Sequence, residues 1–494
     1  MTQRGRRIAI IGAGFSGSLL AVHLLRRSHP DDHIYLIERS AEFGRGLAYA
    51  TGNPRHLLNI RADNMSAFSD RPDHFLDWIR DLPEEQRGPV NTTADRLTFV
   101  SRSLYGAYIQ DILAGEIWGA DCAHRFHLVA DEVVALHPAS SGYRVAVAGG
   151  RHYDVDAVTL AVGNFPPEGT PPGGTANPWD LDVVTSLDAD APVLLIGTGL
   201  TMVDVVISLL DRRHRGEIRA ISRRGLLPRT HAAVLGHPRF LPASTAPRSV
   251  LGLLRRVRAE IRRATAQGGD WRSVMDSLRP DTQDLWRSLS LVEKRRFLRH
   301  LRPWWDVHRH RMAPVVAARI ADALERGQLV IQRARLGRVT GGKSALGSEA
   351  FEVELHAVDG APPSPLSVAR IINCSGPLAD ISRVQSPLIR TLLDNGRVRA
   401  DPLGLGLDVT SRGAVIDRFG RPSDSLFAVG PITKGAFWET TAVPDIRLQC
   451  ERLAEHMLEW LDASLVLTPS LGGWSAGAWT GPDAASVWAM PTAT

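Results

Sequence analysis

Cysteine and long apolar runs are both scarce in this chain of 494 residues. The three cysteines, Cys122, Cys374 and Cys450, lie far apart and form no Cys-x-x-Cys pair. This spacing excludes a disulfide framework, a zinc ribbon and a dithiol redox centre, and it favours a reducing cytoplasm. Because glycine and polar residues interrupt the apolar stretches, we expect no membrane-spanning helix. The sequence therefore predicts a cytoplasmic protein with no membrane partner and no metal site.

The length and the charge distribution indicate several domains and a local anion partner. A chain two to three times the usual domain length predicts at least two domains. The net charge of +5 is concentrated in residues 248–311, which hold 16 Lys/Arg and 7 Asp/Glu. The rest of the chain is slightly acidic. This local excess suits an anionic cofactor or substrate better than a polyanion, so we expect no nucleic-acid partner.

Residues 7–38 have the pattern of a strand, a tight glycine turn, a helix and a second strand. The turn matches GxGxxG and contains Gly12, Gly14, Ser16 and Gly17. Glycines permit the turn, the approach of a pyrophosphate and close packing of helix on strand. The helix N-terminus supplies free N–H groups for phosphates. Glu38, at the end of the second strand, is placed to accept hydrogen bonds from a ribose, so we predict a dinucleotide site rather than a plain α/β turn.

A second unit of the same kind covers residues 192–224. Its turn contains Gly197, Gly199 and Thr201, with Met202 in place of the third glycine. Its second strand ends in Ser222, Arg223 and Arg224 instead of an acid. Arginines here suit a 2′-phosphate, so we expect NADPH rather than NADH, although NADH stays possible. The alternative is that these arginines belong only to a solvated loop.

Two dinucleotide units are most simply explained by one tightly held FAD and one visiting nicotinamide nucleotide. We predict an α/β fold with two Rossmann-like dinucleotide-binding domains, the NAD(P)-binding one inserted into the FAD-binding one, plus a mainly helical segment. The Pro/Gly-rich stretch 163–180 is interpreted as a linker. The predicted ranges are 1–165 for the first part of the FAD-binding domain, 180–365 for the NAD(P)H-binding domain with the basic helical segment 248–325, 366–461 for the second FAD-binding part and 462–494 for a C-terminal tail.

Five motifs in order resemble the bacterial FAD/NAD(P)-binding family of single-component flavin monooxygenases, which includes flavin-dependent urate hydroxylase and amino-acid N-oxygenating flavoenzymes. The motifs are GAGFSG at 12–17, the stretch 43–68, IGTGLTMVD at 196–204, LRPWWDVHRHRMAP at 301–314 and FAVGPITKGAFWETTAVPDIR at 427–447. The resemblance implies that the first unit holds the ADP half of FAD. It also implies that the flavin is lined by Gly44, Arg45, Gly46, Asn59, Arg61 and Met65. A helix N-terminus following Gly430, Pro431 and Thr433 would approach the ribityl and pyrimidine end, although Pro431 stands where many such flavoproteins have an aspartate.

The resemblance further implies an activity. Reduced FAD would form a C4a-(hydro)peroxyflavin that passes one oxygen atom to a small polar metabolite and the other to water. N-oxygenation of an amine or amino acid and hydroxylation of a urate-like N-heterocycle are both open. The expected partners are a small-molecule substrate and molecular oxygen, and the oligomeric state is left open. Two alternatives are an NAD(P)H:acceptor flavin reductase or oxidase and a non-catalytic flavin-binding sensor or scaffold.

The segment 304–311 combines indoles, imidazoles and guanidiniums at an unusual density. If it is helical, Trp304 and His308 share a face, as do Trp305 and Arg309. One interpretation is a pocket wall with arginine for an anionic substrate or cofactor phosphate; the other is a basic helix with aromatic anchors in the core. Just past the expected flavin turn, Trp438 is a further pocket candidate, and Glu439 is a candidate acid or base. The candidate catalytic residues are therefore Trp304, Trp305, His308, Arg309, Trp438 and Glu439.

Overall fold

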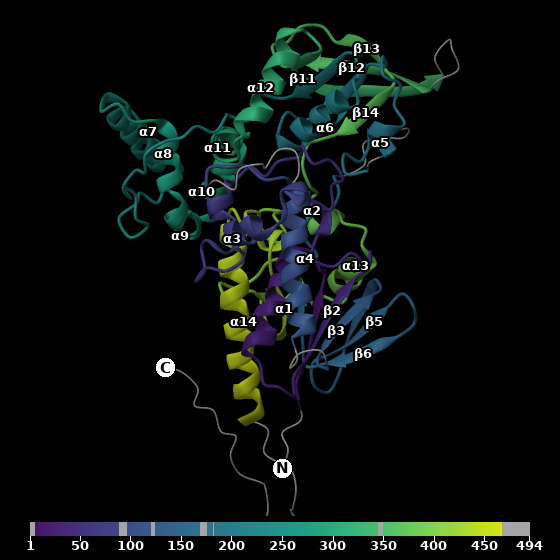
Figure 1. The fold of residues 1–494 in the computed structure, drawn as a ribbon, viewed down its shortest axis with the longest axis vertical. Helices are drawn as coiled ribbons and strands as arrows, with labels where there is room; N and C mark the ends of the chain where they lie inside the picture. Colours follow the sequence, from purple (N-terminus) through teal and green to yellow (C-terminus); the bar gives the residue numbers. More distant parts are fainter. Residues whose placement is uncertain are drawn as a thin grey trace, which may run out of the picture.

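A computed structural model describes residues 5–87, 96–119, 124–167, 175–180, 182–343 and 349–466. It contains two large sheets, one in the lower and one in the upper half of Figure 1, and a group of helices beside them. Within these ranges no helix combines the length and the apolar character needed to cross a bilayer. Cys374 and Cys450 are buried, unpaired thiols, whereas Cys122 lies outside the described residues.

The lower sheet is built from both ends of the chain. Its strand order is β15-β16-β7-β1-β2-β3, and all its neighbours run parallel except the antiparallel pair β15 and β16. The bounds are β1 (Arg7–Ile11), β2 (His33–Glu38), β3 (Phe126–Ala130), β7 (Ala157–Leu160), β15 (Ala414–Ile416) and β16 (Pro422–Ala428). The central strands are nearly continuous apolar runs, as expected when both faces of a parallel sheet are covered.

Both faces of this sheet are packed. Ile8 and Ile10 belong to one core with helices α1, α4 and α14, whereas Ala9 and Ile11 belong to a second core on the opposite face. That second core includes the small antiparallel sheet β4-β5-β6 and helix α13. The helices around the sheet are α1 (Phe15–Arg27), α2 (Gly46–Tyr49), α3 (His74–Asp81), α4 (Arg102–Trp118), α13 (Pro387–Asp394) and α14 (Val443–Val466). The small sheet consists of β4 (Val133–Pro138), β5 (Tyr143–Val147) and β6 (His152–Val155).

The upper sheet comes entirely from the middle of the chain. Its order is β13-β12-β11-β10-β9-β14-β8, with parallel pairing from β11 to β8 and antiparallel pairing in β11-β12-β13. The bounds are β8 (Thr175–Ala176), β9 (Val193–Ile196), β10 (Ile218–Ser222), β11 (Leu329–Lys343), β12 (Glu349–Ala357), β13 (Ser364–Val368) and β14 (Arg370–Asn373). The helices beside it are α5 (Asp182–Thr185), α6 (Leu200–Asp211) and α12 (Pro314–Glu325). The predicted pair of Rossmann-like units, one inserted into the other, is therefore confirmed.

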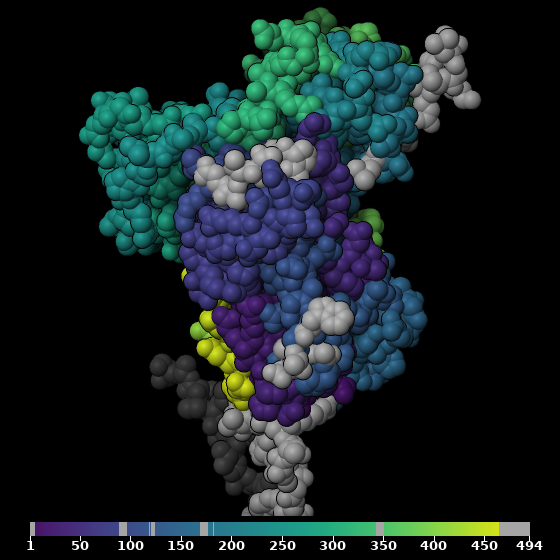
Figure 2. Space-filling view, in the orientation of Figure 1, coloured from purple at the N-terminus to yellow at the C-terminus, as the bar shows by residue number. Residues whose placement is uncertain are grey.

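The basic segment between β10 and β11 folds into helices, as predicted. It forms a lobe that projects sideways from the two sheets, at the upper left of Figures 1 and 2. Its helices are α7 (Val250–Ala266), α8 (Trp271–Ser277), α9 (Thr282–Ser288), α10 (Leu291–Arg296), the π-helical turn η4 (Phe297–Leu301) and α11 (Arg302–Arg309). The single 3₁₀ turns of the chain are η1 (Ala62–Asn64), η2 (Glu84–Gln86), η3 (Arg279–Asp281), η5 (Ile381–Arg383) and η6 (Pro431–Thr433).

Three predicted boundaries differ from the strands and helices observed. The boundary at 365/366 falls inside β13, and β14 lies beyond it as the neighbour of β9 in the upper sheet. The predicted linker 163–180 contributes the edge strand β8. The predicted tail begins inside α14, which continues to Val466; the remaining residues 467–494 lie outside the described residues. Strand β14 has only four residues, and pairing across the sheet rather than local pattern decides where such a strand belongs.

Candidate functional site

The first glycine turn joins β1 to α1, and at Gly12 and Gly17 it has no room for a side chain. Gly12 has φ of 101°, and a Cβ there would lie 2.5 Å from the carbonyl oxygen of Ala161 on the neighbouring strand. A Cβ on Gly17 would overlap the carbonyl oxygen of Gly12, so α1 packs directly on β1. Gly14 precedes α1, whose first N–H groups have no acceptor within the helix. The positive end of the helix dipole and these N–H groups form a site for an anion such as a pyrophosphate.

Glu38 lies beside this turn, as the sequence predicts. One carboxylate oxygen accepts a hydrogen bond of 2.9 Å from the backbone N–H of Ala13, and the other accepts 3.2 Å bonds from the N–H and hydroxyl of Ser40. The backbone bond ties the carboxylate to the glycine turn. Its role toward a ribose stays a prediction.

The segment 44–46 packs against the same turn. The N–H of Gly44 donates to the carbonyl of Ala13 at 2.8 Å, and a Cβ on Gly46 would lie 2.8 Å from Cα of Gly14. Arg45 directs its Nε to Oε1 of Gln110 on α4, at 2.9 Å. Two chain segments about thirty residues apart therefore enclose the start of α1, and the predicted Gly44, Arg45 and Gly46 lie there together.

Asn59, Arg61 and Met65 do not share the contacts of residues 44–46 with the first glycine turn. The carbonyl of Asn59 accepts a 3.0 Å bond from Nε2 of His231, and Nη2 of Arg61 donates to the carbonyl of Ala232 at 2.5 Å. Both residues thus contact the segment that follows β10, at the junction of the two units. Met65 is buried in the core with α1 and α4. No local sequence pattern indicates His231, because its partner Asn59 lies 172 positions away.

The turn after β16 reaches the start of α1 from the other end of the chain. Gly430 has φ of 80°, and a Cβ there would overlap Oγ of Ser16. Gln449 on α14 fixes the turn: its Oε1 accepts from the N–H of Gly430, and its Nε2 donates to Oγ1 of Thr433, both at 2.9 Å. Pro431 starts the single 3₁₀ turn η6, and α14 begins only at Val443. The predicted helix N-terminus at Pro431 is therefore one short turn, and Gln449 was missed because its partner lies nineteen residues away.

The second glycine turn repeats the first with one change. Gly197 has φ of 108°, and a Cβ there would overlap the carbonyl oxygen of Cys374. Gly199 precedes α6, with no atom within 4 Å of the position of a Cβ, and Thr201 lies in the first turn of the helix. Met202, in place of the third glycine, is fully buried in the core between α6 and the sheet. Its side chain explains the departure from the motif, because it packs where the first unit has direct contact of helix and strand.

Arginines gather at the end of β10. Arg223 and Arg224 are exposed, whereas the hydroxyl of Ser222 is engaged within the turn, 2.9 Å from both Oγ1 of Thr198 and the N–H of Gly225. Arg333 on β11 pairs in register with Ser222, and its Cγ lies 2.8 Å from the Cβ position of Gly225. The structure thus adds a third arginine that sequence spacing gave no means of finding.

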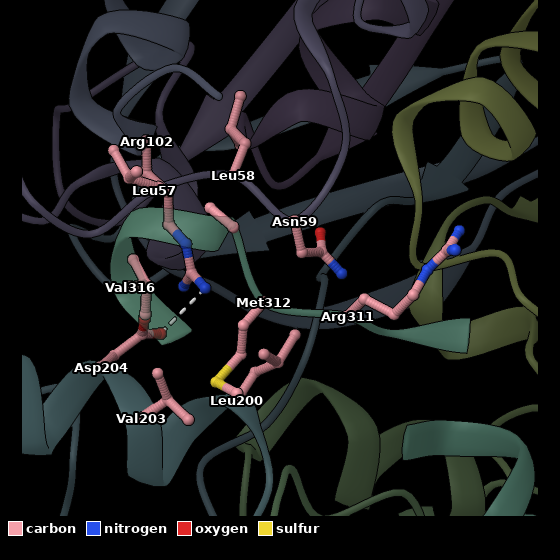
Figure 3. A pocket seen from close by; sticks show the side chains of 11 residues that line it. Leu57, Leu58, Asn59, Arg102, Leu200, Val203, Asp204, Arg311, Met312 and Val316 are labelled. Carbon is pink, nitrogen blue, oxygen red and sulfur yellow. Dashed lines mark ion pairs between the residues drawn. The ribbon is translucent and has the colours of Figure 1, made fainter. Parts of the chain in front are cut away.

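The two units meet along α6. Asp204 of α6 and Arg102 of α4 form an ion pair of 2.8 Å (Figure 3), and His56 bonds to Oγ of Ser208 at 2.8 Å. Leu57, Leu58 and Asn59 face Leu200, Val203, Met312 and Val316 across a small hollow beside the start of α6. Phe165, which follows β7, forms an isolated β-bridge with Leu378, which follows β14. The chain segments that leave the carboxyl ends of these two strands, one from each sheet, therefore meet.

Glu439 joins the helical lobe to the turn after β16. Its Oε1 accepts from Nε1 of Trp305 at 2.6 Å, its Oε2 accepts from Nε of Arg309 at 2.8 Å, and Nε2 of His310 lies 3.5 Å away. Glu439 is a non-glycine residue with φ of 71°, a conformation that surrounding contacts must hold in place. Burial disfavours its charge, but Arg309 and the other neighbours outweigh burial and lower the pKa of Glu439 to about 2. A carboxylate so held stays ionised at neutral pH and serves as an anchor for α11.

The remaining candidate residues lie on two faces of α11 and, in the case of Trp438, just before α14. The helix is confirmed, and Trp305 and Arg309 share the face that meets Glu439. Trp304 is 43% exposed, and His308 contacts its carbonyl through Nδ1 at 2.7 Å while packing edge-on to Trp271. Trp438 is buried and stacked on Trp286, with ring centroids 4.6 Å apart. The predicted set is therefore only partly brought together: Trp305, Arg309 and Glu439 are in contact, and Trp304 and His308 lie apart from them.

Comparisons with known proteins agree with this architecture. Residues 9–165 match the FAD-NAD(P)-binding family. No curated protein matches the chain in sequence. The structure of L-lysine 6-monooxygenase from Pseudomonas syringae is similar, with 16% identity, a TM-score of 0.61 and coverage of 92% of this chain and 100% of that one. The ornithine N-hydroxylase of Kutzneria sp. 744, in a complex with reduced FAD, NADP⁺ and L-ornithine, has 15% identity, a TM-score of 0.61 and coverage of 92% and 99%.

A third similar structure is the FAD-bound cadaverine monooxygenase of Erwinia amylovora. It has 14% identity, a TM-score of 0.59 and coverage of 97% of this chain and 100% of that one. At these identities the likeness concerns the fold, namely two Rossmann-like units with parallel sheets over nearly the whole chain.

Proposed function

We propose, from the premise that residues 9–165 belong to the FAD-NAD(P)-binding family, that the protein is an FAD-dependent monooxygenase that consumes NADPH. Its substrate is a small polar metabolite that receives one oxygen atom, either on an amine or amino-acid nitrogen or on a urate-like N-heterocycle. The observation that carries the proposal is the pair of glycine turns, each opening a helix, on two sheets whose strand ends lead to one junction.

The residues present fit both nucleotides. At Gly14 a Cβ would meet only Cα of Gly46, at 3.5 Å, and at Gly199 it would meet nothing within 4 Å. Each turn therefore leaves backbone N–H groups accessible to a pyrophosphate. Glu38, beside the first turn, would accept hydrogen bonds from a ribose of FAD, and Arg223, Arg224 and Arg333, at the end of β10, would bind the 2′-phosphate of NADPH. The three arginines support NADPH over NADH.

The chemistry supplied by FAD, when bound, is two-electron transfer from NADPH and activation of molecular oxygen. Substrate, NADPH, oxygen and one proton would give oxygenated substrate, NADP⁺ and water. The chain's own contribution is to hold the two nucleotides at one junction and to exclude water there. The side chains packed next to the turn after β16 are large and mostly apolar. Trp286 stacks on Trp438, and Trp305 donates a hydrogen bond to Glu439.

Three measurements on the purified protein test this proposal: the flavin spectrum, the oxidation of NADPH and of NADH with and without L-ornithine, L-lysine, cadaverine or urate, and trapped hydrogen peroxide. We expect bound flavin and NADPH oxidation that one substrate accelerates, with a product heavier by one oxygen atom. Peroxide as the only product would instead identify an oxidase or reductase. Bound flavin without turnover would identify a sensor, and a chain without flavin would contradict the proposal.

A further inference from the structure

Two buried arginines, one at the end of α11 and one just after it, have N–H groups without a hydrogen-bond acceptor among the described residues. The side chains of Arg309 and Arg311 are 5% and 3% exposed. Among the described residues, Nη2 of Arg309 and both Nε and Nη1 of Arg311 are buried without an acceptor. A buried polar group left unpaired destabilises the folded state, and a charged group does so more strongly than a neutral one. Donors in such a place indicate a ligand with acceptor oxygens.

The acids around these arginines are already engaged. Glu439 accepts from Trp305 and Arg309, and Asp445 accepts from Nη1 of Arg279 at 2.8 Å. This leaves Asp276 on α8, whose Oδ1 pairs with Arg311 and lies 3.8 Å from Nη1 of Arg309. One carboxylate is therefore shared by two guanidiniums that converge on it. A second carboxylate beside Asp276 would supply the missing acceptors.

Of these three side chains, Asp276 is the one that is open to solvent. The side chain of Asp276 is 43% exposed, whereas the arginines behind it are buried. Arg311 is one of the residues that line the small hollow beside Leu200, and its side chain extends from there toward the C-terminal segment (Figure 3). Its guanidinium lies 5.9 Å from the ring of Trp271 in the helical lobe. Arg311 therefore connects the hollow at the start of α6 with the helical lobe.

The nearby histidines do not supply the binding charge themselves. Burial and the neighbouring Arg311 lower the pKa of His231 to about 4, and burial lowers the pKa of His310. Both imidazoles are thus neutral at pH 7, and the guanidiniums are the fixed cations of the site. His231 also bonds to Asn59, which connects the site to the segment expected to line the flavin.

We propose that Arg309 and Arg311 bind a carboxylate of the organic substrate, so that the oxygenated metabolite is an organic acid rather than a neutral heterocycle or a plain amine. This inference rests on the proposed function, because it places the acid group beside the junction where oxygen transfer would occur. Guanidinium groups match the planar carboxylate and donate charge-assisted hydrogen bonds to it. A phosphate offers the same chemistry, and its source would be a nucleotide.

The test is calorimetric titration of the flavin-loaded full chain with succinate, glutarate, cadaverine and inorganic phosphate. We expect succinate or glutarate to bind, and Arg311→Gln to weaken that binding at least about ten-fold. Arg311→Lys keeps the charge but not the planar fork, so it should bind with intermediate affinity. Arg255→Gln removes one exposed positive charge on α7 that contributes no donor to the site, and it should leave diacid binding unchanged.

The outcomes separate this inference from the proposed function. Equal binding of the diacids to the unchanged chain and to Arg311→Gln, or no binding at all, would overturn the acid site even if flavin and NADPH turnover are present. Phosphate binding that falls with Arg311→Gln as much as diacid binding would reassign the site to a phosphate. Diacid binding through Arg311 in a chain that holds no flavin would keep the site and reject the monooxygenase. Thermal unfolding of each variant checks folding, and Arg311→Lys carries the test if Arg311→Gln does not fold.

Discussion

The two glycine turns share the same backbone conformation at their first glycine, but different segments surround them. In each, the first glycine has a positive φ, and a Cβ on it would overlap a carbonyl oxygen just after the neighbouring strand, that of Ala161 in one and of Cys374 in the other. The first turn is covered by Gly46, whose Cα approaches Gly14, and by Gly430 at Ser16. The second turn has nothing within 4 Å of the Cβ position of Gly199.

This difference in cover explains how one fold can hold one nucleotide tightly and exchange another. A site covered by segments from both ends of the chain releases its ligand only when those segments move, which suits a resident cofactor. An open helix N-terminus bordered by arginines allows exchange in every turnover and suits a visiting one. The buried Met202 in place of the third glycine fits this reading, because the second helix does not need the same direct contact with its strand.

The largest expected effect is at the covered turn. Gly14→Leu keeps an allowed backbone conformation, with φ of −71°, but fills the space beside Gly46. We expect FAD retention to fall by at least about 100-fold, because the side chain displaces the phosphates from the N–H groups. The measurement is the flavin absorbance of the purified protein and of protein reloaded with FAD. Unchanged flavin content would show that the first turn is not the FAD site.

Glu439 tests the side chains packed next to the turn after β16. Glu439→Gln removes the closer ionic partner of Arg309 and leaves it with Asp276, 3.8 Å away, so we expect a loss of about 3 kcal/mol in unfolding free energy at pH 7. Because the folded-state pKa of Glu439 is about 2, below its ordinary 4.5, its contribution is present above pH 4.5 and is lost as the pH falls from 4.5 toward 2.

Denaturant unfolding of the unchanged chain and of Glu439→Gln between pH 7 and pH 3 measures this contribution. The difference between the two proteins should be constant down to about pH 5 and shrink below it. A difference that does not change with pH would contradict the ionised anchor.

Gly199→Leu is the matched change at the open turn. Its backbone, with φ of −86°, also accepts a side chain. We expect the KM for NADPH to rise by about 30-fold with flavin content unchanged, the reverse of Gly14→Leu. Steady-state kinetics and the flavin spectrum of the same preparation measure both. Loss of flavin in this variant would remove the distinction between the two turns.

Arg333→Ala gives the smallest effect. Removing one of the three arginines proposed to bind the 2′-phosphate should raise the KM for NADPH about five-fold and leave the KM for NADH unchanged. Arg326→Ala, at the exposed end of α12, is the control for a lost surface charge. An equal change for both nucleotides would mean that Arg333 does not read the 2′-phosphate.

Local patterns predicted the local parts of this protein well. The spacing of Gly12, Gly14 and Gly17 predicted the βαβ unit, and the four-residue spacing of Trp305 and Arg309 predicted their shared face on α11. The boundary at 365/366 was wrong because β14, with four residues, is identified only by its pairing with β9.

The residues that complete the sites came from long-range packing. Arg309 meets Glu439 130 positions away, Asn59 meets His231 across 172 positions, and Arg333 reaches the β10 turn through strand register. A nucleotide turn is encoded within about thirty residues, because steric limits on φ and the helix N-terminus are local properties. Which segment covers a turn, and which acid pairs with a buried arginine, depends on how sheets and helices pack. This packing covers the first turn and leaves the second open, and it leaves buried donors of Arg309 and Arg311 without an acceptor among the described residues.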